Sequence, residues 1–165
     1  MESILLRDAG PDDLPRISEI YNHYVLHSTC TYQLEPETLA DRQEWFAEHS
    51  PARYPVVVVE IDGQVAGWGS LSKFHRRAGY DPTAEPSVYI ADGFHRRGLG
   101  RMILENLIER ARAAGFHSLI GGASADQTAS ILLQESLGFA RVGQLKEVGY
   151  KFGRRLDVVY LQRML

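Results

Sequence analysis

The segment Glu85-Pro86-Ser87-Val88-Tyr89-Ile90, followed shortly by His95-Arg96-Arg97-Gly98-Leu99-Gly100, reads as a strand, a glycine loop and a helix start. Apolar residues then recur with helical spacing at Met102, Ile103, Leu107 and Ile108. Amide N–H groups gather at a helix start, where the partial positive charge of the helix attracts a pyrophosphate. The loop therefore predicts a phosphate site, although its glycines also suit a tight strand-to-helix connection.

Two common phosphate-binding motifs do not match this loop. No Gly-x-x-x-x-Gly-Lys-Ser/Thr segment occurs, and the dinucleotide fingerprint requires a glycine where the chain has Ile103. A second strand–helix unit follows the first, with residues 118–120 as its strand. Its helix is expected to begin near Asp126, Thr128 or Ser130 and to end at a C-cap, Gly138.

The rest of the chain supplies antiparallel strands and two early helices. In order, we expect a strand at residues 1–7, a helix from Pro11, a helix behind the capping box Thr38-x-x-Asp41, a hairpin of residues 55–61 and 64–71 around Asp62-Gly63, and closing strands at 140–144 and 156–162. Gly67 and Gly69 mark a possible bulge in that hairpin. Antiparallel strands followed by strand–helix–strand units predict an α/β (α+β) fold, a mixed sheet with helices on both faces.

Length and composition favour one domain over residues 1–165, because 165 residues with 44% hydrophobic content can build one sizeable core. The formal net charge of −3 gives no reason to expect a nucleic acid or an anionic membrane as partner. The only cysteine, Cys30, cannot form an intramolecular disulfide, and no signal peptide or membrane-spanning apolar run is recognisable. These features predict a cytoplasmic protein.

Three segments carry a resemblance to a known family: Tyr21-Asn22-His23-Tyr24, residues 83–89 and residues 148–153. With the glycine loop, they resemble the GCN5-related N-acetyltransferase (GNAT) superfamily, and within it the phosphinothricin and methionine sulfoximine acetyltransferases. The resemblance spans nearly the whole chain and implies the GNAT fold. In that fold the strands at 85–90 and 118–122 run side by side and then splay apart, and acetyl-CoA enters the resulting wedge.

The resemblance also implies which residues hold acetyl-CoA. They are Val88, Tyr89, Ile90, His95, Arg96, Arg97, Gly98, Leu99, Gly100, Arg101, Gln127 and Ser130. His95 stands where the family usually has glutamine or arginine, so Arg96 and Arg97 must supply more of the charge. Backbone N–H groups of the loop should do most of the binding, which makes this departure tolerable.

The reaction implied is attack by a neutral amine on a thioester, which needs a base and a donor that stabilises an oxyanion. Glu85 stands at the family's catalytic glutamate and is expected to act through a water. The oxyanion donor would be a backbone N–H of Tyr89 or Ile90. The alternative interpretation of Glu85 is a solvated or salt-bridged carboxylate at the end of a strand.

Gln134 is a second departure from the family pattern. Many members have a tyrosine there that protonates the leaving thiolate, and the phosphinothricin branch has histidine. Glutamine cannot act as a general acid. A water or Tyr150 must donate instead, or the thiolate leaves unassisted, which a thiol pKa near roughly 8.5 allows.

Substrate residues are expected before the catalytic strand and in the C-terminal loop of residues 148–153. The resemblance places Phe74, Arg77, Tyr80 and Lys151 there. The guanidinium fork of Arg77 suits an α-carboxylate, whereas Phe74 and Tyr80 could equally be packing residues. The surrounding basic run could also be a solvated loop. Because the C-terminal loop of this branch reaches across a two-fold axis, a homodimer is expected.

The expected function is acetyl transfer from acetyl-CoA to the α-amino group of a small amino acid or analogue, of the phosphinothricin or methionine sulfoximine type. One alternative is acetylation of a protein N-terminus or of an antibiotic amine. A second is a catalytically weak acetyl-CoA-binding sensor module, which Gln134 favours and Glu85 opposes. No metal is expected, because His23 and His27 have metal-pair spacing but no third ligand.

Overall fold

The computed structural model describes residues 2–165, which form one seven-stranded sheet in the order β1-β2-β3-β4-β5-β7-β6. Neighbouring strands are antiparallel except β4 and β5, which are parallel. The elements are β1 (Ile4–Asp8), η1 (Pro11–Asp13), α1 (Leu14–His27), α2 (Leu39–Ala47), β2 (Val56–Ile61), β3 (Gln64–Lys73), η2 (Ala78–Tyr80), β4 (Thr83–Ile90), α3 (Leu99–Ala113), β5 (Ser118–Ser124), α4 (Thr128–Ser136), β6 (Ala140–Lys151) and β7 (Arg154–Met164).

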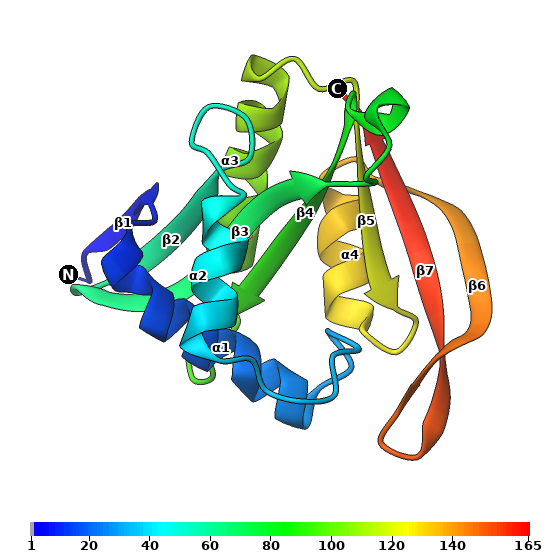
Figure 1. Cartoon of the computed structure of the whole chain (residues 1–165), viewed down its shortest axis with the longest axis horizontal. Coiled ribbons are helices and arrows are strands. Elements are labelled where there is room, and N and C mark those ends of the chain that lie inside the picture. Colours follow the sequence, from blue (N-terminus) through cyan, green and yellow to red (C-terminus); the bar gives the residue numbers. More distant parts are fainter. Residues whose placement is uncertain (1) are drawn as a thin grey trace.

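Helices cover both faces of the sheet, with α1 and α2 on one face and α3 and α4 on the other (Figure 1). On the first face, Ile17 of α1 packs with Val58 and Trp68 of the sheet. On the second face, Ile103 of α3 belongs to a core with Val57. Because successive strand residues point to opposite faces, a strand buried on both sides has consecutive apolar residues, as β2 has in its four valines, residues 56–59. The predicted mixed sheet with helices on both faces is confirmed.

Local signals in the sequence match the turns and caps. The Thr38 hydroxyl accepts from the Asp41 amide at 3.2 Å, and Asp41 accepts from the Thr38 amide at 2.7 Å, so the capping box is confirmed. Asp62 and Gly63 both have positive φ, 50° and 82°, as a two-residue hairpin turn requires. Gly138, at φ 84°, follows α4 and donates its amide to Glu135, which satisfies a helix-end carbonyl.

The closing hairpin is longer than the sequence indicated. β6 and β7 continue to a tight turn at Phe152 and Gly153, so residues 148–153, expected as a loop, are the tip of a hairpin. β6 is an edge strand that exposes nearly all of its side chains. It therefore lacks the alternation of apolar and polar residues from which a half-buried strand is recognised.

The parallel pair β4 and β5 separates almost at once. Only Thr83 with Ser118 and Ala84 with Leu119 are paired, and the two strands then diverge (Figure 1). The Ala91 amide bonds to β3, so alternation along the strand turns the backbone groups of residues 86, 88 and 90 toward the gap. Pro86 fits here because its missing N–H leaves no sheet bond unmade.

Candidate active site

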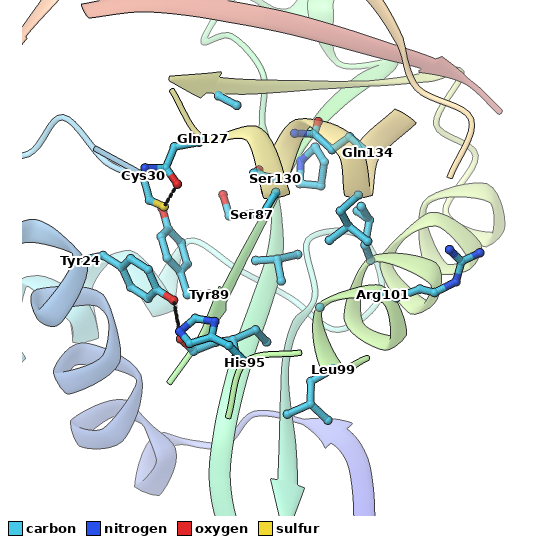
Figure 2. Close-up of a pocket in the computed structure, with 18 of the residues that line it drawn as sticks. Tyr24, Cys30, Ser87, Tyr89, His95, Leu99, Arg101, Gln127, Ser130 and Gln134 are labelled. Atoms are coloured by element: carbon cyan, nitrogen blue, oxygen red, sulfur yellow. Dashed lines mark hydrogen bonds between the residues drawn. The ribbon is translucent and has the colours of Figure 1, made fainter. Parts of the chain in front are cut away.

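A cavity of about 750 Å³ opens in the gap between β4 and β5. The start of α3 and the first turns of α4 complete its walls. The side chains labelled in Figure 2 come from these elements, from α1 and from the loops that hold Cys30 and His95. Of the residues expected to hold acetyl-CoA, the structure places these in the lining: Val88, Tyr89, Ile90, His95, Arg96, Gly98, Leu99, Gly100, Arg101, Gln127 and Ser130. Glu85 lines the same cavity.

The glycine loop presents free amides to this cavity. Gly98 is the N-cap of α3 at φ 78°, and no side chain caps the helix. The first helical hydrogen bond runs from the Met102 amide to the Gly98 carbonyl, so the amides of residues 99–101 have no helical acceptor. Three unpaired N–H groups at the positive end of a 15-residue helix form an anion site.

The arginines of the loop contribute unequally to this site. Arg96 lines the cavity, whereas the Arg97 guanidinium pairs with Glu2 at 3.1 Å and does not line it. The Arg101 side chain points away from the other labelled residues and pairs with Glu105 at 2.8 Å (Figure 2). Backbone amides and Arg96 therefore attract an anion to this site. The Arg97 guanidinium, which was expected to contribute, forms an ion pair with Glu2 instead.

A second, smaller cavity of about 270 Å³ lies on the α1 and α2 face of the sheet. It shares Tyr21, Glu85, Ser87 and Tyr89 with the first cavity. Strand β4 thus forms the partition between the two spaces. A ligand in each cavity would meet the other at Glu85 and Ser87.

Glu85 stands at this meeting point without a partner. Within residues 2–165 it makes no ion pair and no hydrogen bond, so the salt-bridged interpretation is not what the structure shows. Burial raises the pKa of the Glu85 carboxyl above its ordinary value. A carboxylate with a raised pKa is a better proton acceptor, as a general base near neutral pH requires.

Backbone donors lie beside Glu85 along β4. Alternation turns the Tyr89 amide toward β3 and the amides of Val88 and Ile90 toward the gap. Tyr24 of α1 donates its hydroxyl to the Ile90 carbonyl at 2.5 Å and lies 3.4 Å from the His95 ring (Figure 2). Burial raises the pKa of Tyr24 to about 12, so it stays a hydroxyl donor. From the sequence, Tyr24 could not be distinguished from the core-facing residues of α1, because it has the same helical spacing as they have.

Gln134 is buried in the cavity wall, and its side-chain Oε1 has no hydrogen-bond partner in the described structure. A side-chain carbon at Gly121 would collide with that oxygen, so the site depends on a glycine in β5. A buried amide that lacks a partner is costly and marks a place where a ligand can donate. The Gln127 side chain, by contrast, has partners for both of its groups. It accepts from the Cys30 thiol at 3.1 Å (Figure 2) and donates to the Thr29 hydroxyl at 2.8 Å.

The expected substrate residues lie apart from both cavities. Phe74 and Tyr80 pack edge to face, 5.9 Å between ring centroids, in the loop between β3 and β4, and Arg77 is exposed there. Lys151 is buried and donates to the carbonyls of Ser28 and Thr31 at 2.7 and 2.8 Å, and burial lowers its pKa. In this chain it ties the closing hairpin to the end of α1.

Tyr150, the possible proton donor to the thiolate, also lies away from the cavities. Its side chain is 62% exposed on β6, and it lines neither space. A donor from the same chain would have to come from another group. The buried polar residue of α4 in the cavity wall is Gln134, whose amide is not an acid.

The wall of the smaller cavity contains a buried charge that sequence reasoning missed. Arg42 of α2 pairs with Glu37 at 2.6 Å, and the two side chains are only 4% and 10% exposed. The guanidinium lies 4.4–5.0 Å from the ring centroids of Tyr21, Trp45 and Trp68. The sequence feature that could have indicated this contact is the spacing of Arg42 and Trp45, which are three residues apart on one helix and therefore share a face.

No metal centre emerges from the part of the chain that the structure describes. The rings of His23 and His27 are 5.0 Å apart, and no group of three potential metal-ligating residues occurs in residues 2–165. None of the helices described is long and apolar enough to cross a membrane.

Comparison with known proteins identifies the family. The model of the acetyltransferase (GNAT) domain matches residues 6–160, which is most of the chain. The chain belongs to the GNAT acetyltransferase family. The splayed strands and the amide-rich helix start described above are therefore parts of an N-acetyltransferase.

Individual relatives cover nearly the whole chain. The L-methionine sulfoximine/L-methionine sulfone acetyltransferase of Pseudomonas aeruginosa is 41% identical over 161 residues, covering 97% of this chain and 94% of the relative. The L-amino acid N-acyltransferase of Escherichia coli is 38% identical, with 97% and 93% covered. A crystal structure of the phosphinothricin acetyltransferase of Sinorhizobium meliloti with AcCoA superposes with a TM-score of 0.95 at 35% identity, covering 98% of this chain and 88% of that one.

Proposed function

We propose that this chain transfers an acetyl group from acetyl-CoA to the α-amino group of a small amino acid or analogue of the methionine sulfoximine or phosphinothricin type. The carrying observation is the pair of cavities that meet at Glu85, one with an anion site and one of only about 270 Å³. The relatives' names supply the substrate class. The small second cavity favours a compact acceptor over the N-terminus of a protein.

The residues of the larger cavity fit acetyl-CoA. The free amides of residues 99–101 suit the pyrophosphate, and the unpaired Gln134 oxygen suits an N–H donor of the pantetheine arm. When bound, acetyl-CoA supplies a thioester as the acetyl source. The amides of Val88 and Ile90 face the gap, where they can stabilise charge on the acetyl oxygen.

Glu85 acts as the general base in this proposal. An α-amino group arrives as an ammonium ion and must lose a proton before it can attack. Glu85 takes that proton through a water in the shared part of the two cavities, and its raised pKa favours the transfer. Gln134 does not protonate the leaving thiolate, because an amide is not an acid at neutral pH.

Arg77 is proposed to pair with the acceptor's α-carboxylate, with Phe74 and Tyr80 beside it. Its loop joins β3 to β4, the strand that carries Glu85. The loop lies outside the cavities in this structure, so substrate must draw Arg77 inward or a second copy must complete the site. Lys151 is already engaged by three backbone carbonyls and is the weaker candidate for the carboxylate.

We further propose a homodimer that acts in the cytoplasm, with one domain per chain. The closing hairpin exposes Val142, Leu145, Val148, Tyr150 and Phe152, each between 46% and 62% accessible. A long exposed edge with apolar side chains favours pairing with another chain. Light scattering on the purified protein tests the dimer, and a monomeric mass at micromolar concentration would contradict it.

The function is tested by CoA release with a panel of free amino acids, their analogues, decarboxylated amines and short peptides. We expect the highest kcat/KM for a free amino acid or analogue. Equal turnover of peptides and free amino acids would reject the substrate class. Acetyl-CoA binding without turnover of any amine would favour the sensor alternative.

A further inference from the structure

Glu85 has a hydroxyl neighbour across the sheet. In the antiparallel pair β3 and β4, Ser72 is the register partner of Glu85. Side chains directly opposite each other in such a pair lie on the same face, with Cβ atoms about 4.5–5.5 Å apart. Both side chains line the smaller cavity, so solvent held there can join the Glu85 carboxyl to the Ser72 hydroxyl.

Ser72 is in turn bonded to a histidine whose hydrogen position is determined by its partners. His49, just after α2, has Nδ1 2.7 Å from the Trp45 carbonyl and Nε2 2.9 Å from the Ser72 hydroxyl. A carbonyl can only accept, so Nδ1 carries the hydrogen. In the neutral ring Nε2 is then the bare acceptor, and Ser72 donates to it.

The surroundings of His49 keep the ring neutral and partly open to solvent. Burial lowers the pKa of His49, the hydrogen bond to the Trp45 carbonyl and the adjacent Glu48 carboxylate raise it, and Arg42 on α2 lowers it, with a net shift below the ordinary value. Glu85 faces Ser72 from β4, on the far side of that hydroxyl. The ring is only partly buried and lies tilted against Trp45, with the two ring centroids 4.1 Å apart. It can therefore exchange protons with bulk water.

We propose that Ser72 and His49 form the route by which the proton collected by Glu85 leaves the site, an inference that rests on the proposed role of Glu85 as base. The Glu85 O–H bond breaks and its proton passes through cavity solvent to Ser72 Oγ. The original Ser72 proton moves to His49 Nε2, which forms an N–H bond and an imidazolium. The proton on His49 Nε2 then passes to bulk water at the partly exposed ring, while Nδ1 keeps its hydrogen on the Trp45 carbonyl. The neutral ring again accepts from Ser72, and the Glu85 carboxylate is restored.

Glu85 must lose its proton before it can act as a base again, and its surroundings offer no direct way to do so. Every turnover leaves one proton on Glu85, and within residues 2–165 no basic side chain pairs with that carboxylate. An acceptor seated in the smaller cavity also separates Glu85 from bulk water on that face, and leaves only solvent held between Glu85 and Ser72 as its contact. Ser72 and His49 lead out of the cavity along the end of α2 instead.

Buffer dependence of turnover tests the route. We expect Ser72→Ala and His49→Gln each to lower kcat by about tenfold in dilute buffer, less than loss of the base itself. A small buffer base such as imidazole at high concentration should restore much of this loss, whereas wild type should not respond. The double variant should be no slower than either single one, because both act in one path. His27→Gln, an exposed histidine outside both cavities, is the matched control.

A titration of His49 by NMR in the protein without acetyl-CoA gives a readout independent of activity. Glu85→Gln removes a negative charge beyond Ser72, so the His49 pKa should fall. Ser72→Ala removes a donor to the neutral ring, so the His49 pKa should rise. Identical His49 titrations in all three proteins, or losses of kcat that no buffer restores, would overturn the relay. If instead Glu85→Gln keeps full turnover, the proposed base itself fails.

Discussion

The two cavities that meet at β4 are built in different ways. The larger one takes its anion site from consecutive residues, where a left-handed glycine frees the amides of residues 99–101. The smaller one takes its wall from α1, α2, β3 and β4, where buried side chains such as Arg42 and Trp68 come together from distant parts of the chain. The proposed pyrophosphate site is thus a property of a short segment, whereas the proposed acceptor site is a property of the packed core. Variants in each should fail in different measurements.

The largest effect is expected where the two cavities join. Glu85→Gln keeps the size of the side chain and removes the base, so kcat should fall by about a hundred- to ten-thousand-fold. Calorimetry should show unchanged acetyl-CoA affinity, because the anion site is untouched. A variant that retains more than about half of wild-type kcat at neutral pH would remove Glu85 from the mechanism.

Variants in the wall of the smaller cavity should lower the free energy of unfolding. Arg42→Met strands the buried Glu37 carboxylate, and loss of one partner of a buried pair costs roughly 3–5 kcal/mol. Urea denaturation measures the cost, and the double variant Arg42→Met/Glu37→Gln should recover much of it. Arg101→Met, which breaks an exposed pair with Glu105, should change the free energy of unfolding by less than about 1 kcal/mol. If Arg42→Met and Arg101→Met lower the free energy of unfolding equally, the smaller cavity does not depend on a buried ion pair in the way proposed.

Variants in the anion site should lower the affinity for acetyl-CoA. Gly98→Val places a β-branched side chain at φ 78°, where it also occupies the approach to the free amides. Acetyl-CoA affinity should drop by at least about tenfold, a loss of about 1.4 kcal/mol. Gly63→Val imposes similar strain at φ 82° in the β2–β3 turn, away from the site. If calorimetry finds equal affinities for the two variants, the loop is not the pyrophosphate site.

The pH dependence of turnover separates the base from the rest of the site. Because the pKa of Glu85 is raised, kcat/KM should fall about tenfold per pH unit below an acid limb that lies above the ordinary carboxyl value of 4.5. The folded protein also holds this proton more tightly than the unfolded chain. Stability from this group therefore falls as pH rises from the ordinary pKa through the raised one, and Glu85→Gln should remove that slope. An acid limb at the ordinary carboxyl pKa would contradict the role of burial.

The smallest effect is expected in the exposed loop between β3 and β4. Arg77→Ala should raise KM for a free amino acid by several-fold with little change in kcat, since a carboxylate contact is present before and during reaction. Arg76→Ala, the neighbouring exposed arginine, is the matched control. If both variants keep the preference for amino acids over decarboxylated amines, the carboxylate is held elsewhere.

Features that depend on neighbouring residues were predictable from the sequence, whereas features that depend on packing were not. The capping box at Thr38, the turn at Asp62-Gly63 and the helix end at Gly138 were predictable, because each depends on a few neighbouring residues. The length of β6 was not, since an exposed edge strand carries no burial pattern. Arg42 and Tyr24 were not recognised as site residues, because a helical stripe looks the same whether it meets a core or a cavity.

The sequence by itself determined the anion site at the start of α3, because glycine conformation and free helix amides are local properties. It also placed Glu85 at the head of the strand that carries the site. Only the tertiary structure decided what surrounds that carboxylate: the gap left when β4 and β5 part, the aromatic wall from α1 and α2, and the burial that raises its pKa. The reason is that desolvation depends on every element that excludes water from a point, and those elements are far apart in the chain.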